Sequence, residues 1–186
     1  MSVGIVNSEI FRTHNTGEAH SENYKRLDSI NDFFKSKDIF KKVQNIPLRK
    51  ILPQELHIIH SNDYENQVID FCNNGGGWID EDTVTSKESY DVALNAAGSV
   101  LEAIDRVFTK DIDKAFCMIR PPGHHALPDK SMGFCLFSNL ALGAVYALNK
   151  YKLDRILILD WDAHHGNGTE QIFYKSNKVF TVSWHQ

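Results

Sequence analysis

The stretch Arg155-Ile-Leu-Ile-Leu-Asp160-Trp-Asp162-Ala-His164 joins an apolar run to carboxylates and an imidazole. A short run of isoleucine and leucine is typical of a buried β-strand. Aspartate and histidine are side chains that a catalytic zinc ion takes as ligands. A strand that ends in Asp-x-Asp-x-His therefore predicts a metal-dependent hydrolase, with its site at the end of that strand.

The spacing of the potential metal ligands within this stretch predicts which of them lie on the same face. Alternate side chains of an extended segment share a face, so Asp160, Asp162 and His164 are expected on one face and His165 on the other. A zinc site would take one carboxylate and one imidazole of this set, which leaves one aspartate for another role. Catalytic zinc usually has three protein ligands, and the sequence before Gln186 offers no obvious third.

A second histidine doublet, His124-His125, follows Arg120-Pro-Pro-Gly and another apolar run. Adjacent imidazoles with different neighbours can hold different pKa values, which suits one as a general base and the other as an electrostatic partner. A single buried histidine is usually structural, whereas two doublets at strand ends, each beside a glycine, favour a catalytic site. The nearby Gly133-Phe134 pair can place an aromatic wall beside a substrate.

The composition excludes several classes of protein. The net charge of -4 and the pI near 6.1 argue against direct nucleic-acid binding, which needs a basic patch. Three widely spaced cysteines indicate neither a disulfide framework nor a cysteine zinc site. The N-terminus lacks the apolar core of a secretory signal, and no run is long enough to span a membrane. These features predict a cytoplasmic protein, or a nuclear one in a eukaryote, without a membrane partner.

Hydrophobic periodicity predicts an α/β fold. Strands are expected over residues 3–7, 115–119, 156–159 and 179–182, and helices over residues 24–35, 53–59, 61–71, 86–108, 136–151 and 169–175. The glycine run in residues 73–77 predicts a turn. Strands that are apolar throughout and alternate with helices indicate a mainly parallel sheet covered by helices on both sides. In such sheets the active site lies beyond the carboxyl ends of the strands, where both histidine doublets fall.

The last predicted strand lies close to Gln186. A domain seldom ends on a strand beside its site without a closing element. Residues 1–186 are therefore expected to be the N-terminal portion of a single longer domain whose C-terminal part is missing.

Several segments, taken in order, resemble the zinc-dependent histone deacetylase family, including its bacterial acetylpolyamine amidohydrolase and acetoin-utilisation relatives. The matching segments are His14-Asn-Thr-Gly17, His20-Ser-Glu-Asn-Tyr-Lys-Arg26, Gly76-Gly-Trp-Ile-Asp80-Glu-Asp82, Arg120-Pro-Pro-Gly-His124-His125, Gly133-Phe134-Cys-Leu-Phe-Ser-Asn139 and Asp160-Trp-Asp162-Ala-His164-His165-Gly-Asn-Gly-Thr169. The Arg-Pro-Pro-Gly-His-His form is more similar to the class II and bacterial branch than to class I. The resemblance implies an arginase-like three-layer α/β/α fold and hydrolysis of an N-acetyl amide.

The resemblance also implies roles for the residues of the catalytic centre. Asp162 and His164 would bind Zn²⁺, and His124 and His125 would form the tandem acid/base pair. Asp160 would help to hold a structural potassium ion.

Further implied roles concern the surroundings of that centre. The Ser183 hydroxyl would be a second ligand of the potassium ion. Gly133 and Phe134 would line the acyl-lysine tunnel, and Arg26 would lie beside an internal acetate channel. The rim carboxylate that grips the substrate backbone would be either of two aspartates, Asp80 or Asp82.

The chain departs from the family pattern in two ways. Ser21 replaces the usual proline of His-Pro-Glu, which a loop should tolerate. The family's third zinc ligand, an aspartate, and its carbonyl-polarising Tyr or His would lie beyond Gln186. The complete protein is therefore expected to catalyse and this portion alone to be incomplete.

The expected substrate is acetyl-lysine of histones or other proteins. The alternatives are an acetylpolyamine or another small acetylated amine, and a truncated relative without catalysis. An arginase-like binuclear hydrolase would share the fold, but it would want an Asp-x-His-x-Asp pattern, which this chain lacks.

Overall fold

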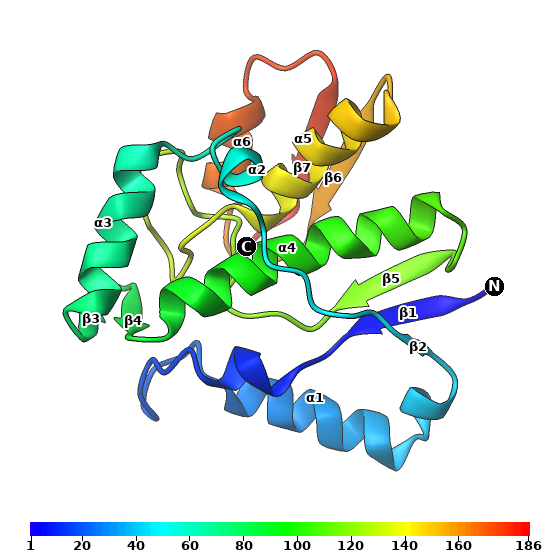
Figure 1. Cartoon of the computed structure of the whole chain (residues 1–186), viewed down its shortest axis with the longest axis horizontal. Coiled ribbons are helices and arrows are strands. Elements are labelled where there is room, and N and C mark those ends of the chain that lie inside the picture. Colours follow the sequence, from blue (N-terminus) through cyan, green and yellow to red (C-terminus); the bar gives the residue numbers. More distant parts are fainter.

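The structure is a computed structural model that describes all 186 residues (Figure 1). In chain order its elements are β1 (Val3–Val6), η1 (Glu9–Arg12), α1 (Lys25–Ser36), η2 (Ile39–Lys41), β2 (Gln44–Asn45), α2 (Pro53–Leu56), α3 (Asn62–Asn73), β3 (Gly76–Trp78), β4 (Val84–Ser86), α4 (Ser89–Phe108), β5 (Lys114–Cys117), α5 (Asn139–Tyr151), β6 (Ile156–Asp160), α6 (Asn167–Phe173) and β7 (Val179–Ser183).

The strands pair mainly in parallel. Strands β2, β1 and β5 form one parallel sheet in that order, and β6 and β7 form a second parallel pair. Strands β3 and β4 form an antiparallel hairpin. The α/β class and the mainly parallel pairing predicted from the sequence are confirmed.

Helices cover the first sheet on both sides. Figure 1 shows α1 below the sheet β2-β1-β5 and α4 above it. Ile5 and Val6 of β1 share one buried cluster with Leu27 of α1 and Ala96 of α4. Because apolar side chains from both helices meet the strands in this cluster, burial of their surface holds the three layers together.

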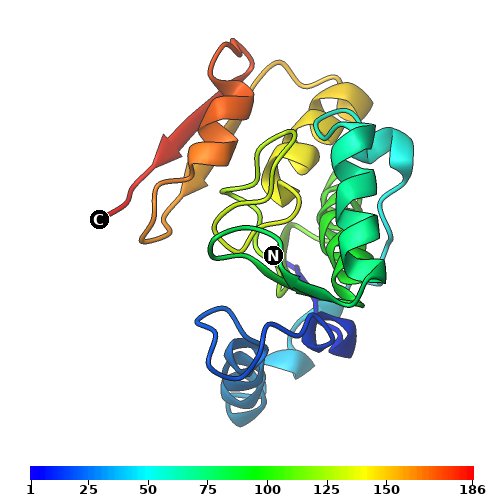
Figure 2. The same ribbon diagram turned by 90° about the vertical axis from the view of Figure 1, so that its left-hand side faces the viewer.

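A second core lies on the other side of α4. Leu101 of α4 packs there with Val68 of α3 and Leu142 of α5. The loop residues Leu136 and Phe137 fill the same core and are almost fully buried. Figure 2 shows the loops that follow β5 between the β6–β7 pair and helices α3 and α4. The tandem histidines belong to these loops.

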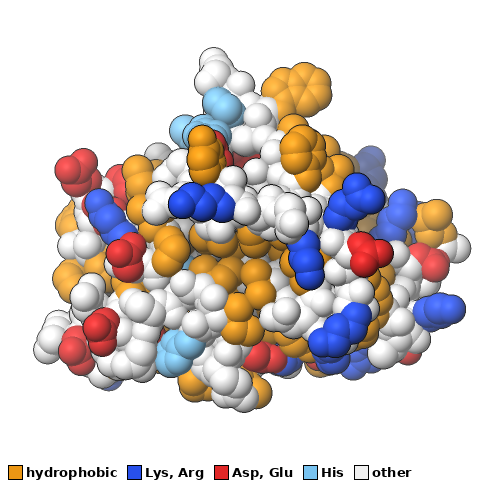
Figure 3. All heavy atoms as spheres, turned by 90° about the horizontal axis from the view of Figure 1, so that it is seen from above, with side chains coloured by type: hydrophobic (Ala, Val, Ile, Leu, Met, Phe, Trp, Pro, Cys, Tyr) orange, Lys and Arg blue, Asp and Glu red, His pale blue; other side chains and the backbone are white.

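Within residues 1–186, helices cover the β6–β7 pair on one face only. Ile158 and Val179 are buried in a cluster that Ala141 of α5 joins. On the opposite face, Leu157 is 62% exposed and its cross-strand partner Phe180 is 69% exposed. In Figure 3, hydrophobic side chains on the face seen from above lie among charged ones, with a group of histidines near one edge.

Several predicted element boundaries are wrong. The sequence predicts a turn over residues 73–77, but β3 begins at Gly76, whose φ is 77°. A Cβ at Gly76 would lie 2.5 Å from the Thr85 carbonyl oxygen, so this close cross-strand contact requires glycine. Strand β2 was not predicted because both of its residues are exposed and give no apolar pattern.

The helices begin and end at slightly different residues than predicted. Helix α5 begins at Asn139 rather than 136, and α4 begins at Ser89 rather than 86, because the residues before them serve the core and the hairpin. Helix α2 ends at Leu56 rather than 59, and α6 spans Asn167–Phe173 rather than 169–175. None of the helices has the length and apolar character needed to cross a membrane.

Candidate active site

Eight of the eleven predicted site residues line a cavity of about 490 Å³; Asp80, Asp160 and Ser183 do not. Its lining comes from the loop before α1 and the first turn of that helix, from the β3–β4 loop, from the loops after β5 and from the segment after β6. The lining residues are Ser21, Glu22, Arg26, Asp82, Ile119, Pro122, His124, His125, Gly133, Phe134, Asp162 and His164. The structure therefore brings both histidine doublets to one cavity. The first doublet contributes both His124 and His125, and the second contributes His164 only.

Each of the tandem histidines is anchored through Nδ1. His124 Nδ1 lies 2.8 Å from Asp160 Oδ2, and His125 Nδ1 lies 2.5 Å from Asn167 Oδ1. Because a carboxylate or amide oxygen accepts a hydrogen bond, each Nδ1 carries the proton and each Nε2 is left for other partners. The two rings are 3.9 Å apart between centroids.

The two anchors differ in charge. Asp160 is a carboxylate, which stabilises a positive charge that forms on His124, whereas Asn167 is a neutral amide. Burial lowers the pKa of His125, and the neighbouring His124 and His164 add to this effect. At neutral pH His125 is therefore a neutral imidazole with an unprotonated nitrogen.

Asp162 and His164 converge on one point. Asp162 Oδ2 lies 3.1 Å from His164 Nδ1, close to the roughly 3.3 Å that separates two ligands of a tetrahedral zinc ion. Burial raises the pKa of Asp162, but hydrogen bonds from the His164 backbone N–H and ring outweigh it and lower the pKa. The pair therefore fits as two ligands of a zinc ion. No group of three or more His, Cys, Asp or Glu side chains able to hold one metal ion occurs in the structure.

Asp160 and Asp162 approach different ring nitrogens of the same histidine, His124. The regular strand ends at Asp160, and the chain bends at residues 163–164. Asp160 then contacts Nδ1 of His124, whereas Asp162 Oδ2 lies 3.9 Å from Nε2 of the same ring. His165 points elsewhere, as expected, and pairs with Glu170 at 2.6 Å.

Gly133 and Phe134 form a tight turn against His125. Both have a left-handed backbone, with φ of 56° and 68°. A Cβ at Gly133 would lie 2.2 Å from the His125 ring, so only glycine allows this approach. The Gly133 N–H donates to Asp82 Oδ1 at 3.1 Å, and the Phe134 N–H donates to the Thr83 hydroxyl at 3.1 Å.

The structure separates the two candidate rim aspartates. Asp82 lines the cavity, whereas Asp80 does not; Asp80 lies 4.0 Å from Lys130 and accepts a hydrogen bond from the Glu81 N–H. Arg26 also lines the cavity, 3.5 Å from Glu22.

Asp160 and Ser183 lie on neighbouring strands. They are directly paired in the β6–β7 register and line a small cavity of about 220 Å³. The Ser183 hydroxyl accepts a hydrogen bond from the Gly166 N–H at 3.2 Å. The structure therefore brings the two expected potassium ligands together.

A buried ion pair supports the tandem-histidine loop, and the sequence reasoning assigned it no role. Arg120 is fully buried and donates to both carboxylate oxygens of Glu22 at 2.6 and 2.7 Å. It also donates to the Phe11 carbonyl oxygen at 2.8 Å. Burial alone would raise the pKa of Glu22, but Arg120 lowers it. The pair joins the loop that carries His124 to the loop before α1.

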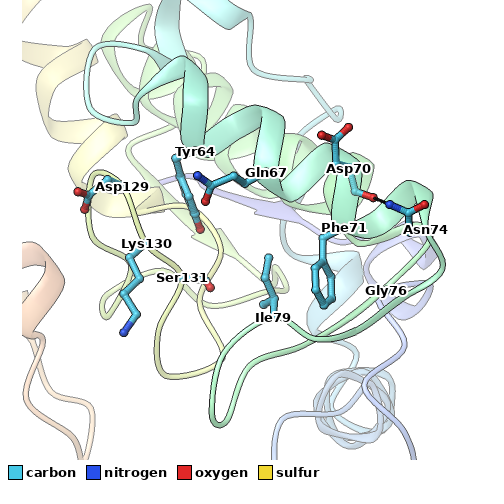
Figure 4. Close-up of a pocket in the computed structure, with 10 residues that line it drawn as sticks. All are labelled: Tyr64, Gln67, Asp70, Phe71, Asn74, Gly76, Ile79, Asp129, Lys130 and Ser131. Carbon is cyan, nitrogen blue, oxygen red and sulfur yellow. Dashed lines mark hydrogen bonds between the residues drawn. The ribbon is translucent and has the colours of Figure 1, made fainter.

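A larger cavity, of about 580 Å³, lies away from this chemistry. Figure 4 shows it between α3, which contributes Tyr64 and Phe71, and the loop that carries Lys130. Its lining contains acidic, amide and hydroxyl side chains but no histidine or cysteine. We therefore place the candidate active site in the smaller cavity, where paired imidazoles and potential zinc ligands meet.

Comparison with known proteins agrees with this site. A family model described as the histone deacetylase domain matches residues 20–186. The chain belongs to the histone deacetylase family. It therefore has the three-layer α/β/α fold that the sequence resemblance implied.

Individual relatives support the same assignment. The chain is 38% identical to a probable deacetylase of Archaeoglobus fulgidus over 188 residues, which covers 100% of this chain and 52% of that protein. It is 36% identical to a histone deacetylase-like amidohydrolase of Pseudomonas aeruginosa, covering 91% of this chain and 44% of that protein. The crystal structure of the HDA15 HD domain superimposes with a TM-score of 0.94 at 32% identity, covering 100% of this chain and 54% of that one. The chain thus spans about half the length of these relatives.

Proposed function

We propose that this chain supplies the tandem histidines and two zinc ligands of a deacetylase that hydrolyses an N-acetyl amide to acetate and an amine. One observation carries the proposal: both anchored imidazoles face the cavity in which Asp162 and His164 converge. This arrangement combines an acid–base group and a charge-stabilising group with a metal-binding pair, a combination suited to metal-assisted hydrolysis of an amide.

The two histidines have different roles in the hydrolysis. In hydrolysis, water attacks the carbonyl carbon, the carbon–nitrogen bond breaks, and one proton passes from the water to the leaving nitrogen. His125, neutral at neutral pH, accepts the proton from the attacking water and returns it to the amine nitrogen. His124, held by Asp160, stabilises the charges that develop beside it.

Asp162 and His164 would hold Zn²⁺, which would supply Lewis-acid polarisation of the amide carbonyl and of water. Asp160 and Ser183, with neighbouring backbone carbonyls, would hold a structural potassium ion. Gly133 and Phe134 would flank the acyl chain, and Asp82 would be the rim carboxylate that contacts the substrate backbone.

The proposed substrate is acetyl-lysine of a histone or another protein. Gly133 and Phe134 line the catalytic cavity beside His125, where they would flank an aliphatic side chain, and this lining supports the choice. A small acetylated amine is the second candidate, because one relative, from Danio rerio, is a polyamine deacetylase that is 32% identical over 171 residues.

The test measures acetyl-lysine hydrolysis by the complete gene product. His124→Ala and His125→Ala should each lower kcat by about two to four orders of magnitude, the range for loss of a general acid–base group. Zinc content should stay unchanged, because neither residue is a proposed ligand. His57→Ala serves as the control, because His57 pairs with Glu65 outside the cavity. Normal turnover in either tandem variant would remove that histidine from the mechanism.

A further inference from the structure

The Asn167 amide that holds His125 also contacts the side chain of Met132. Asn167 Oδ1 lies 2.5 Å from His125 Nδ1, and Asn167 Nδ2 lies 3.5 Å from the Met132 sulfur. This sulfur is the only hydrogen-bond partner of Nδ2 in the structure. The amide therefore lies between an imidazole and a thioether, with its oxygen toward the imidazole and its NH2 group toward the thioether.

Backbone contacts hold the two residues that meet at this amide. Met132 and Cys135 exchange two backbone hydrogen bonds, of 3.2 and 2.9 Å, and Cys135 is fully buried. Asn167 begins α6, and two residues later the Thr169 N–H donates to the His124 carbonyl oxygen at 3.1 Å. The backbones of Met132 and Asn167 are thus fixed by different loops, and the contact between their side chains follows from the packing of these loops.

The orientation of the Asn167 amide decides which nitrogen of His125 carries the proton. An amide oxygen accepts a hydrogen bond and an amide NH2 group donates one, and a half rotation of the amide exchanges the two. With the oxygen toward the ring, Nδ1 carries the proton and Nε2 keeps its lone pair. With the NH2 group toward the ring, Nδ1 has to accept, so the proton moves to Nε2. His125 then cannot act as a base through Nε2.

The two orientations of the amide present different groups to Met132. A thioether sulfur is a weak acceptor and has no proton to donate, so it pairs with the NH2 group and not with the oxygen. Water in the same place would serve either orientation, because water both donates and accepts. A carboxylate in place of the amide would need no selection, because both of its oxygens accept. A neutral amide beside His125 therefore requires a neighbour that distinguishes its two ends.

We propose that Met132 is a positioning residue, which selects the orientation of the Asn167 amide and thereby keeps the proton of the neutral His125 ring on Nδ1. Met132 does not line the catalytic cavity, so it acts on the ring through Asn167. The consequence for turnover rests on the proposed deacetylase function. The position of the proton on the ring does not.

Nitrogen NMR of the complete gene product measures the position of that proton directly. The ring nitrogens of isotope-labelled His125, assigned with His125→Ala, are recorded above the pKa of the ring, where only the two neutral tautomers are present. Wild type should carry the proton on Nδ1. Met132→Leu nearly keeps the volume of the side chain and removes the acceptor. It should shift the tautomer ratio toward the Nε2–H form by about two- to tenfold, the range for one ordinary hydrogen bond.

Asn167→Asp separates an effect through the amide from a change in packing. Either oxygen of a carboxylate accepts from Nδ1, so Met132→Leu should leave the tautomer ratio unchanged in the Asn167→Asp background. Met118→Leu is the same substitution in the buried core between α1 and α4, and it should not alter the ratio. An unchanged ratio in Met132→Leu, or an equal change in both backgrounds, would overturn the proposal.

Hydrolysis of acetyl-lysine by the same proteins gives the second measurement. The kcat of Met132→Leu should fall in proportion to the loss of the Nδ1–H tautomer, with KM unchanged, because Met132 does not line the cavity. A changed tautomer ratio in a protein that hydrolyses no acetyl amide would support the positioning role and contradict the proposed function. An unchanged kcat beside a changed ratio would support the positioning of the proton and contradict the assignment of His125 as the base.

Discussion

His60 is a buried histidine that takes no part in the catalytic cavity. Its Nε2 accepts a hydrogen bond from the Ser138 N–H at 2.9 Å, and its Nδ1 lies 3.3 Å from the Pro128 carbonyl oxygen. The ring packs against Tyr64 and Phe137. Burial lowers the pKa of His60 to about 4, because a buried cation loses its hydration. The folded state therefore keeps this ring neutral.

The pKa of His60 predicts how stability depends on pH. Between the unfolded value of about 6.5 and the folded value of about 4, only the unfolded chain takes up the proton. The contribution of this residue is fully present above pH 6.5, and the free energy of unfolding falls by about 1.4 kcal/mol per pH unit as the pH drops below that value. His14, whose pKa burial also lowers to about 4, adds a similar slope.

Urea unfolding at a series of pH values checks this prediction. His60→Gln, which keeps an amide donor and acceptor at the position of the ring, should lose stability overall and should reduce the slope between pH 6.5 and 4 by about 1.4 kcal/mol per pH unit. An unchanged slope in the variant would show that His60 does not carry the effect.

For single residues, the sequence predicts the catalytic histidines and the proposed zinc ligands better than the residues that hold them in place. The histidine doublets can be identified in the sequence because each follows a predicted strand. Asp162 and His164 can be identified as a pair because they are only two residues apart. Asn167 and Glu22 lie far from their partners in the chain, and no local pattern indicates which ring or guanidinium they will meet. Their positions depend on how the loops pack, which a spacing argument does not contain.

Helix α3 illustrates an element whose start is written in the sequence. Ser61 lies directly before the helix, and its hydroxyl accepts a hydrogen bond from the Tyr64 N–H at 3.1 Å. The Ser61 hydroxyl is therefore the N-cap of α3, and it satisfies one of the free N–H groups of the first turn.

Loss of this cap should destabilise the chain measurably. Ser61→Ala should lower the free energy of unfolding by about 1 kcal/mol, and Ser61→Asp should restore most of it, because a carboxylate also accepts from the first turn. Ser29→Ala, within α1, removes a hydroxyl without removing a cap and should change stability little. Chemical denaturation measures all of these variants. A Ser61→Ala protein as stable as the wild type would exclude the capping role.

Elements with a clear apolar period were predicted well, and those without one were not. Helix α4 presents Val92, Ala96 and Ala103 to one core, so its 3.6-residue pattern is plain in the sequence. Strand β3 consists of two glycines and a tryptophan, and its pairing with β4 depends on a contact across the hairpin rather than on local preference. Tertiary contacts therefore determine the formation of the elements that the local sequence does not predict.

The whole molecule has an uncovered apolar surface beside its site. Leu157, Leu159 and Phe180 point away from α5 and α6 on the open face of the β6–β7 pair. Continuous apolar strands predicted burial on both faces, and the described residues provide it on only one. A strand face of this kind is suited to packing against a further layer of the fold.

The central claim is that Asp162 and His164 form part of a zinc site. The most direct measurement is the zinc content of the complete gene product, determined by elemental analysis beside the Asp162→Ala/His164→Ala double variant and His124→Ala. We expect one zinc per chain in the wild type and in His124→Ala, and none in the double variant, which should still fold because both side chains are partly exposed. Full zinc retention in a folded double variant would contradict this account of the site.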